Sequence, residues 1–119
     1  MSAILSIGTS NGIFVLGETP GDWKLMGQGL TGRQVTCIQP GANGQLWIGT
    51  DKGGLFHSSD LENWQPAVNE LSGTGVYSLV FHPKQSKVML CGTAPASLHL
   101  SLDGGKKFQE LPSLRQHPS

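Results

Sequence analysis

A short triplet returns three times along the chain at nearly constant spacing. It reads Ile-Gly-Thr from Ile7, Ile-Gly-Thr from Ile48 and Cys-Gly-Thr from Cys91, so the three glycines lie 41 and 43 residues apart. An aromatic residue follows each glycine after 15 or 16 residues, at Trp23, Trp64 and Phe108. Two features that stay in phase through three copies predict a structural unit of about forty residues.

Each unit contains short apolar runs that are typical of strands. The triplets are followed by GIFVL from Gly12, GLFHS from Gly54 and SLHLS from Ser97, and the last two are preceded by VTCIQP from Val35 and VYSLVFHP from Val76. Turn dipeptides such as Asn-Gly and Gly-Gly separate the runs. The runs are too short for helices, which need ten or more residues.

Four antiparallel strands in every forty residues match the blade of a β-propeller. We therefore predict an all-β chain that forms a partial β-propeller of about three four-stranded antiparallel blades. The first blade is incomplete because it begins at its second strand. The expected blades span residues 3–30, 35–70 and 76–112, followed by a polar tail over 113–119. A β-sandwich is the alternative, but a sandwich does not require a repeat of fixed period.

A polar motif closes the third repeat. Ser101, Asp103, Gly105 and Phe108 follow the spacing of the Asp box, or BNR repeat, which reads S-x-D-x-G-x-T-W, and this segment resembles it. The second repeat keeps part of the motif, at Ser58, Asp60 and Trp64, and the first keeps only the acidic Glu18. The chain as a whole resembles the amino-terminal portion of sialidase-like propellers of the BNR-repeat glycosyl hydrolase group.

This motif has a local physical explanation. A Ser or Asp side chain at the end of a hairpin accepts hydrogen bonds from loop amides that the turn leaves unpaired. Glycine allows a positive φ, and the aromatic ring packs under the loop. In the family that the motif resembles, the box lies on the blade periphery. We therefore predict a structural role, not catalysis, for Ser58, Asp60, Trp64, Ser101, Asp103, Gly105 and Phe108.

Residues for glycoside hydrolysis are not gathered in any motif. The resemblance to sialidases would require an arginine cluster and an activated tyrosine, but the chain has only Arg33 and Arg115, and we expect its one tyrosine, Tyr77, to be packed in a strand. Ordinary glycosidases need two carboxylates at a suitable separation. Here the carboxylates fall in predicted turns, strand ends and loops, at Glu18, Asp22, Asp51, Asp60, Glu62, Glu70, Asp103 and Glu110. We predict no catalytic residue in this chain.

Metal and cofactor sites are also not predicted. His57 and His99 fall at what we interpret as equivalent places in the third strands of successive repeats, and neither has two further ligands nearby. His82 ends an expected inner strand before Pro83, and His117 lies in the tail. No glycine-rich stretch carries the lysine of a phosphate loop. Cys37 and Cys91 lie in apolar runs and are predicted to be buried thiols, with a disulfide as the alternative.

Charge excludes some partners. Eight basic residues balance eight acidic ones, and only Lys106 and Lys107 are adjacent, so we expect neither nucleic acid nor an anionic membrane as a partner. The amino terminus has no basic leader and only a short apolar stretch, which favours a cytoplasmic location.

Three blades are too few to close a ring, because propellers typically use four to eight. Two apolar blade faces would then lack a neighbour. The chain is either a truncated part of a longer propeller, which we favour, or a unit that assembles from several copies. We predict a non-catalytic scaffold for binding or assembly. Its partners would be further blades, other copies, or a protein or carbohydrate ligand. The alternative is part of a glycoside hydrolase whose catalytic residues lie outside this chain.

Overall fold

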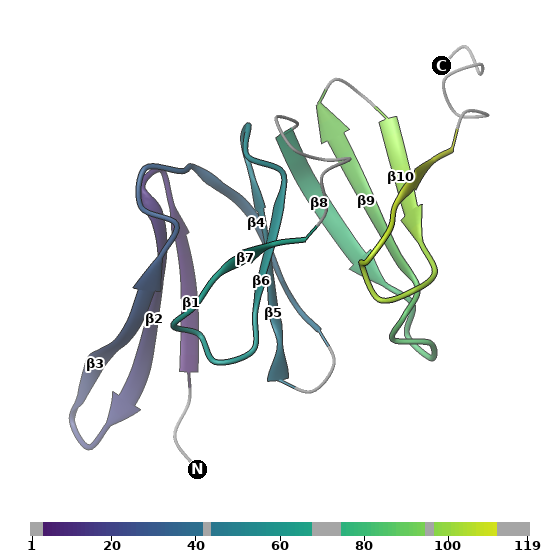
Figure 1. The fold of residues 1–119 in the computed structure, drawn as a ribbon. Helices are drawn as coiled ribbons and strands as arrows, with labels where there is room; N and C mark the ends of the chain where they lie inside the picture. The colour runs from purple at the N-terminus through teal and green to yellow at the C-terminus, as the bar shows by residue number, and fades with distance from the viewer. Residues whose placement is uncertain (1–3, 42–43, 68–74, 95–96, 112–119) are drawn as a thin grey trace.

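The computed structural model describes residues 4–41, 44–67, 75–94 and 97–111, and these residues form three antiparallel sheets (Figure 1). The first sheet has β1 (Ile4–Thr9), β2 (Gly12–Thr19) and β3 (Asp22–Gly29). The second has β4 (Val35–Pro40), β5 (Leu46–Thr50), β6 (Leu55–Ser58) and β7 (Gln65–Pro66). The third has β8 (Gly75–Phe81), β9 (Met89–Ala94), β10 (Ser97–Ser101) and β11 (Gln109–Glu110). The predicted tail, with Arg115 and His117, and Glu70 lie outside the described residues.

Within each sheet, strands that are consecutive in the chain are neighbours, as in a meander. The sheets stand side by side in chain order (Figure 1). β4 lies against both β1 and β8, and β5 lies against β8, so adjacent sheets meet through the first one or two strands of each. This arrangement is a partial β-propeller. The predicted all-β fold class is confirmed, including a first blade of three strands instead of four.

Side-chain alternation along the strands builds two apolar layers, one on each side of the middle sheet. Leu46, Ile48 and Phe56 pack with Ile13 between the first and second sheets. The second layer lies between the second and third sheets and consists of Trp47, Leu55, Val76, Leu79, Met89, Cys91 and Phe108. Every residue of β5 is buried, because this strand has a sheet on each face.

The glycine of the repeated triplet makes close packing between sheets possible. A side chain at Gly8 would collide with Val35, and a side chain at Gly49 would collide with Val76. Each valine belongs to the first strand of the following sheet. The repeated triplet in the sequence therefore marks the positions where one blade packs closely against the next.

The two outer faces of the arc remain apolar. On the first sheet, Leu5 pairs with Leu16 and Leu16 with Leu25, and the side chain of Leu25 is 51% exposed. On the third sheet, Val80 pairs with Leu90, and Val80 is 60% exposed. The described part of the chain thus offers two unpartnered apolar surfaces, one at each end of the arc.

Two expectations about single side chains are wrong. His57 and His99 are not equivalent, because Phe56, not His57, stands where His99 stands: Leu55 pairs with Gly49 as Leu98 pairs with Gly92. An offset of one residue along a strand turns a side chain to the opposite face. Tyr77 is not packed in the sheet but is 47% exposed, because the pairing of β8 with β9 is irregular between Val76 and Ser78.

The cysteines are both free thiols, with Cys91 buried and Cys37 half-buried between the second and third sheets. Burial raises the pKa of Cys91 to about 12 and also raises that of Cys37. No helix in the described ranges has the length and apolar character that spanning a membrane would require.

Candidate functional site

The candidate site is built on two turns in which a threonine hydroxyl bonds to the backbone of the turn that follows it. In the β1–β2 turn, Thr9 Oγ1 accepts a hydrogen bond from Asn11 N at 3.0 Å and donates one to Gly12 O at 2.9 Å. In the β5–β6 turn, Thr50 Oγ1 accepts from Gly53 N at 3.0 Å and donates to Gly54 O at 2.9 Å. The threonine of the repeated triplet therefore fixes the turn that follows it.

The connection between β3 and β4 is attached to both turns. Gly32 N donates to Asn11 Oδ1 at 2.6 Å, and Gly12 N donates to the carbonyl of Arg33 at 2.7 Å. On the other side, Asp51 N donates to the carbonyl of Gln34 at 3.0 Å. These bonds hold the backbone of Arg33 and Gln34 between the first and second blades.

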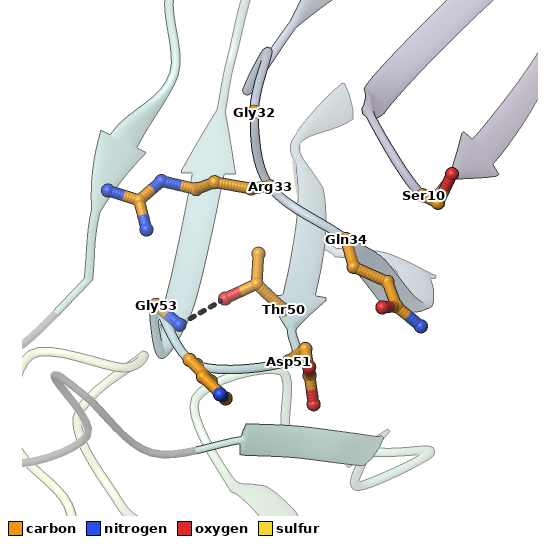
Figure 2. Close-up of a pocket in the computed structure, with 8 residues that line it drawn as sticks. Ser10, Gly32, Arg33, Gln34, Thr50, Asp51 and Gly53 are labelled. Atoms are coloured by element: carbon orange, nitrogen blue, oxygen red, sulfur yellow. Dashed lines mark hydrogen bonds between the residues drawn. The ribbon is translucent and has the colours of Figure 1, made fainter.

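A cavity of about 310 Å³ lies at this end of the two blades. Its walls come from both turns and from the connection between them, as Figure 2 shows. The lining residues are Ser10, Gly32, Arg33, Gln34, Thr50, Asp51, Lys52 and Gly53. The wall is largely polar, with two side-chain cations and one carboxylate.

Arg33 is the best-defined charged group of the cavity wall. Its guanidinium carbon lies 5.0 Å from the centre of the Phe56 ring, which is a cation–π contact. Any side chain at position 53 would collide with the guanidinium, so Gly53 leaves the room that it occupies. Within the described ranges, no carboxylate pairs with Arg33. The guanidinium is therefore positioned by the Phe56 ring and by the space that Gly53 leaves.

Asp51 is already engaged by the third blade. The hydroxyl of Tyr77 donates a hydrogen bond to Asp51 Oδ1. This hydrogen bond, together with desolvation and the negative charge of Asp51, raises the pKa of Tyr77 above its ordinary value. Asp51 therefore links the second blade to the third at the rim of the cavity, and it is the one acidic side chain that lines it.

The cavity wall combines one carboxylate with two cations and several hydrogen-bonding groups. Two carboxylates are required for ordinary glycoside hydrolysis, one as acid and one as base or nucleophile. The cavity wall supplies one carboxylate, together with Arg33, Lys52, an amide and hydroxyl groups. In the part of the chain that the structure describes, no group of three His, Cys, Asp or Glu residues could hold a metal ion.

The loop after β6 contains the first of the two predicted box motifs. Asp60 Oδ1 accepts hydrogen bonds from Glu62 N at 2.9 Å, Asn63 N at 2.8 Å and Ser58 Oγ at 3.0 Å. Asn63 Nδ2 donates to Asp60 Oδ2 at 2.8 Å, and Leu61 N donates to Ser58 Oγ at 2.9 Å. The backbone and side-chain donors, the amide of Asn63 first, hold the pKa of Asp60 far below its usual value.

The loop after β10 repeats this arrangement. Ser101 Oγ donates to Asp103 Oδ1 at 2.9 Å, and Lys107 N donates to the same oxygen at 3.0 Å. Gly105 N donates to Ser101 Oγ at 2.9 Å, and Phe108 is buried. The hydrogen bond from Ser101, followed by the amide of Lys107, lowers the pKa of Asp103. In this loop Gly105 has φ of 91°.

The box residues and the cavity are separate. None of Ser58, Asp60, Ser101 or Asp103 lines the cavity beside Arg33. Trp64 is half-buried against Gly29 of the first blade, and a side chain at Gly29 would collide with its ring. The structure does bring the box residues of each loop together, through hydrogen bonds within the loop.

Sequence reasoning missed the cavity because its residues come from three segments, none of which carries a recognisable motif. One signal was present. Arg33 precedes the strand that begins at Val35, and the repeated Thr9 and Thr50 each precede a tight turn. Only the three-dimensional arrangement shows that both threonine turns flank Arg33.

The three meandering sheets define an arc of a β-propeller. The sequence model of the two component regulator propeller family matches residues 29–52, which run from the end of β3 to the β5–β6 turn. Over 82 residues, the chain is 29% identical to the protein of Neosartorya fischeri named "Probable oligoxyloglucan-reducing end-specific xyloglucanase". That stretch is 64% of this chain and 10% of the fungal protein.

Two solved structures are similar in fold. One is YCF48 bound to D1 peptide, with a TM-score of 0.70 and 22% identity, covering 94% of this chain and 36% of that one. The other is an ancestral GH74 enzyme, with a TM-score of 0.65 and 16% identity, covering 92% of this chain and 18% of the enzyme. The chain therefore spans well under half of these propellers, and the likeness shows the β-propeller fold.

Proposed function

We propose that the chain is a non-catalytic segment of a β-propeller and that the cavity between its first two blades binds a ligand. The observation that carries this proposal is the charge arrangement of the cavity. Arg33 is held over Phe56 with its N–H groups available, Lys52 lies in the same wall, and the one carboxylate, Asp51, is engaged by Tyr77. This set suits recognition of an anionic group better than hydrolysis.

The ligand class that fits is an acidic segment of a polypeptide. Arginine binds carboxylates through two parallel N–H donors, and a guanidinium already held by an aromatic ring loses little freedom on binding. The hydroxyl of Ser10 and the amide of Gln34 can hydrogen-bond to a peptide backbone. The similar fold of YCF48, whose structure contains a bound peptide, supports a peptide as the ligand.

An array of acidic, neutral and basic decapeptides, probed with the full chain, tests this proposal. We expect acidic peptides to be retained, with binding that weakens as salt concentration rises. Arg33→Ala should weaken the best peptide by about tenfold or more, since a charged hydrogen bond contributes roughly 1.5 to 3 kcal/mol. Lys84→Ala, which removes a cation outside the cavity, is the matched control and should leave binding unchanged.

A glycoside hydrolase is the second candidate, because the sequence match to a xyloglucanase favours it. Incubation of the chain with xyloglucan oligosaccharides and aryl glycosides distinguishes the two functions. Turnover that disappears in Asp51→Asn would contradict the scaffold proposal. Unchanged substrates, together with peptide binding that requires Arg33, would support it.

We also propose that the loops Ser58–Trp64 and Ser101–Phe108 are Asp boxes of the BNR type and that the arc works within a longer propeller. The hydrogen bonds of Asp60 and Asp103 support the first part. The two open apolar faces support the second. Mass determination of the native protein, purified from its source, tests the second part, because a longer propeller would have several times the mass of this chain.

A further inference from the structure

Tyr77 belongs to the third blade but bonds to a residue of the cavity between the first two blades. Asp51 follows β5 and lines the cavity, whereas Tyr77 lies in β8. The hydroxyl of Tyr77 donates a hydrogen bond to Asp51 Oδ1. Among the described residues that line the cavity, Asp51 is the one acid. A residue of another blade therefore orients the carboxylate of the cavity wall.

An irregularity in β8 places Tyr77 beside Asp51. β8 pairs with β9 at Val76 and at Ser78, and the register shifts between them, so Tyr77 stands outside the ladder. An irregularity of this kind changes the direction in which a side chain points. Gly75 leaves the room that is needed, because a side chain there would collide with the carbonyl of Asp51 and with the ring of Tyr77. The backbone of β8 thus accommodates the ring next to Asp51.

The second blade uses the same irregularity differently. The register of β4 with β5 shifts between Val35 and Cys37, which places Thr36 outside the ladder, as Tyr77 is in β8. Thr36 Oγ1 donates a hydrogen bond to the carbonyl of Val76 in the third blade. Both irregular residues therefore join the second blade to the third, but only the hydroxyl of Tyr77 bonds to a side chain of the cavity wall.

The position of the Asp51 carboxylate matters because cations share the cavity wall with it. Lys52 is its neighbour in the chain, and the guanidinium of Arg33 lies against Gly53, two residues after Asp51. In Figure 2 the Asp51 side chain points away from that guanidinium. A carboxylate released by Tyr77 is able to turn toward these cations through rotation of its side-chain bonds. It would then compete with an acidic ligand for them.

We propose that Tyr77 sets the charge preference of the cavity by holding the carboxylate of Asp51 away from Arg33 and Lys52. This inference rests on the proposed function, because it concerns the same cavity and the same acidic ligand. Without the hydroxyl of Tyr77, Asp51 neutralises part of the positive charge, so acidic peptides lose affinity and basic peptides gain it. Tyr77 is a positioning residue, since it acts on the ligand through Asp51.

Binding of two labelled decapeptides to the full chain, followed by fluorescence anisotropy, tests this inference. One peptide alternates glutamate with glycine, and the other alternates lysine with glycine. Tyr77→Phe should bind the acidic peptide about threefold more weakly, the size of effect that an exposed ion pair produces, and should bind the basic peptide more tightly. Adding Asp51→Asn to Tyr77→Phe should restore at least the original affinity for the acidic peptide, because no carboxylate is left to compete.

Thr36→Val is the matched control. It removes the other hydroxyl contact between the second and third blades and keeps every charge of the cavity wall. The affinities for both peptides should therefore stay unchanged. A general loosening of the contact between these blades would instead weaken binding in Thr36→Val and in Tyr77→Phe alike.

A second measurement needs no ligand. The chain has one tyrosine, so ultraviolet absorbance during alkaline titration reports the ionisation of Tyr77 alone. The hydrogen bond to Asp51, followed by desolvation and the charge of Asp51, raises the pKa of Tyr77. Asp51→Asn should therefore lower this pKa toward its ordinary value. An unchanged pKa would show that the bond does not form in solution, and it would overturn the inference.

The binding results separate this inference from the proposed function. If the unmodified chain does not bind the acidic peptide, the proposed function is wrong and this inference is wrong with it. If the unmodified chain binds, only this inference is overturned by any of three results: equal binding in Tyr77→Phe, equal weakening in Thr36→Val, or no recovery when Asp51→Asn is added.

Discussion

His57 is a residue whose burial opposes its own ionisation. Its ring stacks on Trp47 with centroids 4.7 Å apart, and its Nδ1 is buried without a hydrogen-bond partner. Desolvation lowers its pKa from 6.5. A lowered pKa in the folded state means that the unfolded chain binds more protons below pH 6.5. Stability should therefore be present above that pH and fall as the solution is acidified through the lowered pKa.

His57→Leu should remove this loss, because leucine is the residue that the third blade uses at the equivalent place, Leu100. We expect a gain of about 1 kcal/mol at pH 7 from removing a buried unsatisfied nitrogen. We also expect the urea concentration at the unfolding midpoint to change less between pH 7 and pH 5 than it does in the unmodified chain. A profile that is unchanged in His57→Leu would contradict this account.

At Asp60, in contrast to His57, the lowered pKa favours the charged form of the side chain. Its folded-state pKa is lowered by amide donors, so the stability that it contributes is present above about pH 4 and is lost in more acidic solution. Asp60→Asn should lower the urea midpoint at pH 7 and reduce its further decrease between pH 5 and 3. Glu62→Gln, a change at an exposed residue of the same loop, should leave the urea midpoint at pH 7 unchanged. Equal effects of the two variants would show that the hydrogen bonds of Asp60 do not stabilise the loop.

The box residues could be proposed from sequence because the motif is local: donor and acceptor lie within a few residues of each other in the chain. The cavity could not, because the backbone on either side of Arg33 is held by residues about twenty positions away in the chain: Gly32 N donates to Asn11 Oδ1, and Asp51 N donates to the carbonyl of Gln34. The face to which His57 points also escaped prediction. A strand reverses its faces with every residue, so an alignment uncertain by one residue loses that information.

Among the elements, the middle strands of the blades depend on glycine. Gly49 and Gly92 occupy equivalent places, but only Gly49 is covered by the following blade, through Val76. Gly49→Ala should destabilise the fold by about 1 to 3 kcal/mol, as expected for overpacking. Gly92→Ala should cost less, because an added methyl group there meets only the side chains of Ser78 and Leu98 in its own sheet.

Urea unfolding of both glycine variants measures this difference. Equal destabilisation would mean that the collision lies within each sheet and not between blades.

The presence of the strands could be predicted from the sequence, because turn glycines fall at the junctions where the repeat period predicts one strand to end and the next to begin. The repeat also indicated that the first sheet begins at the second strand of a blade, since Ile7-Gly8-Thr9 matches the triplets that lie in β5 and β9. What the glycine does was not predictable, since it depends on a residue 27 positions further along the chain.

On the scale of the whole molecule, the two ends of the arc differ in the number of strands that the structure describes. Among the described residues, the first blade has three strands and the third has four, and each of these two sheets has one neighbouring sheet. The described residues extend over 53 Å in the longest direction and 26 Å in the shortest, so a large share of the surface is blade face. Apolar patches of this kind mark contact surfaces or association hazards.

The two open faces should therefore cause self-association that polar substitution relieves. Leu25→Lys with Val80→Lys places one charge on each face, at side chains that are 51% and 60% exposed. Since neither side chain is buried, stability should change by no more than about 0.5 kcal/mol. Sedimentation velocity at rising concentration should show less association for the double variant than for the unmodified chain, with Leu102→Lys behaving as the unmodified chain does. If the double variant associates as strongly as the unmodified chain, these two faces are not the cause of the association.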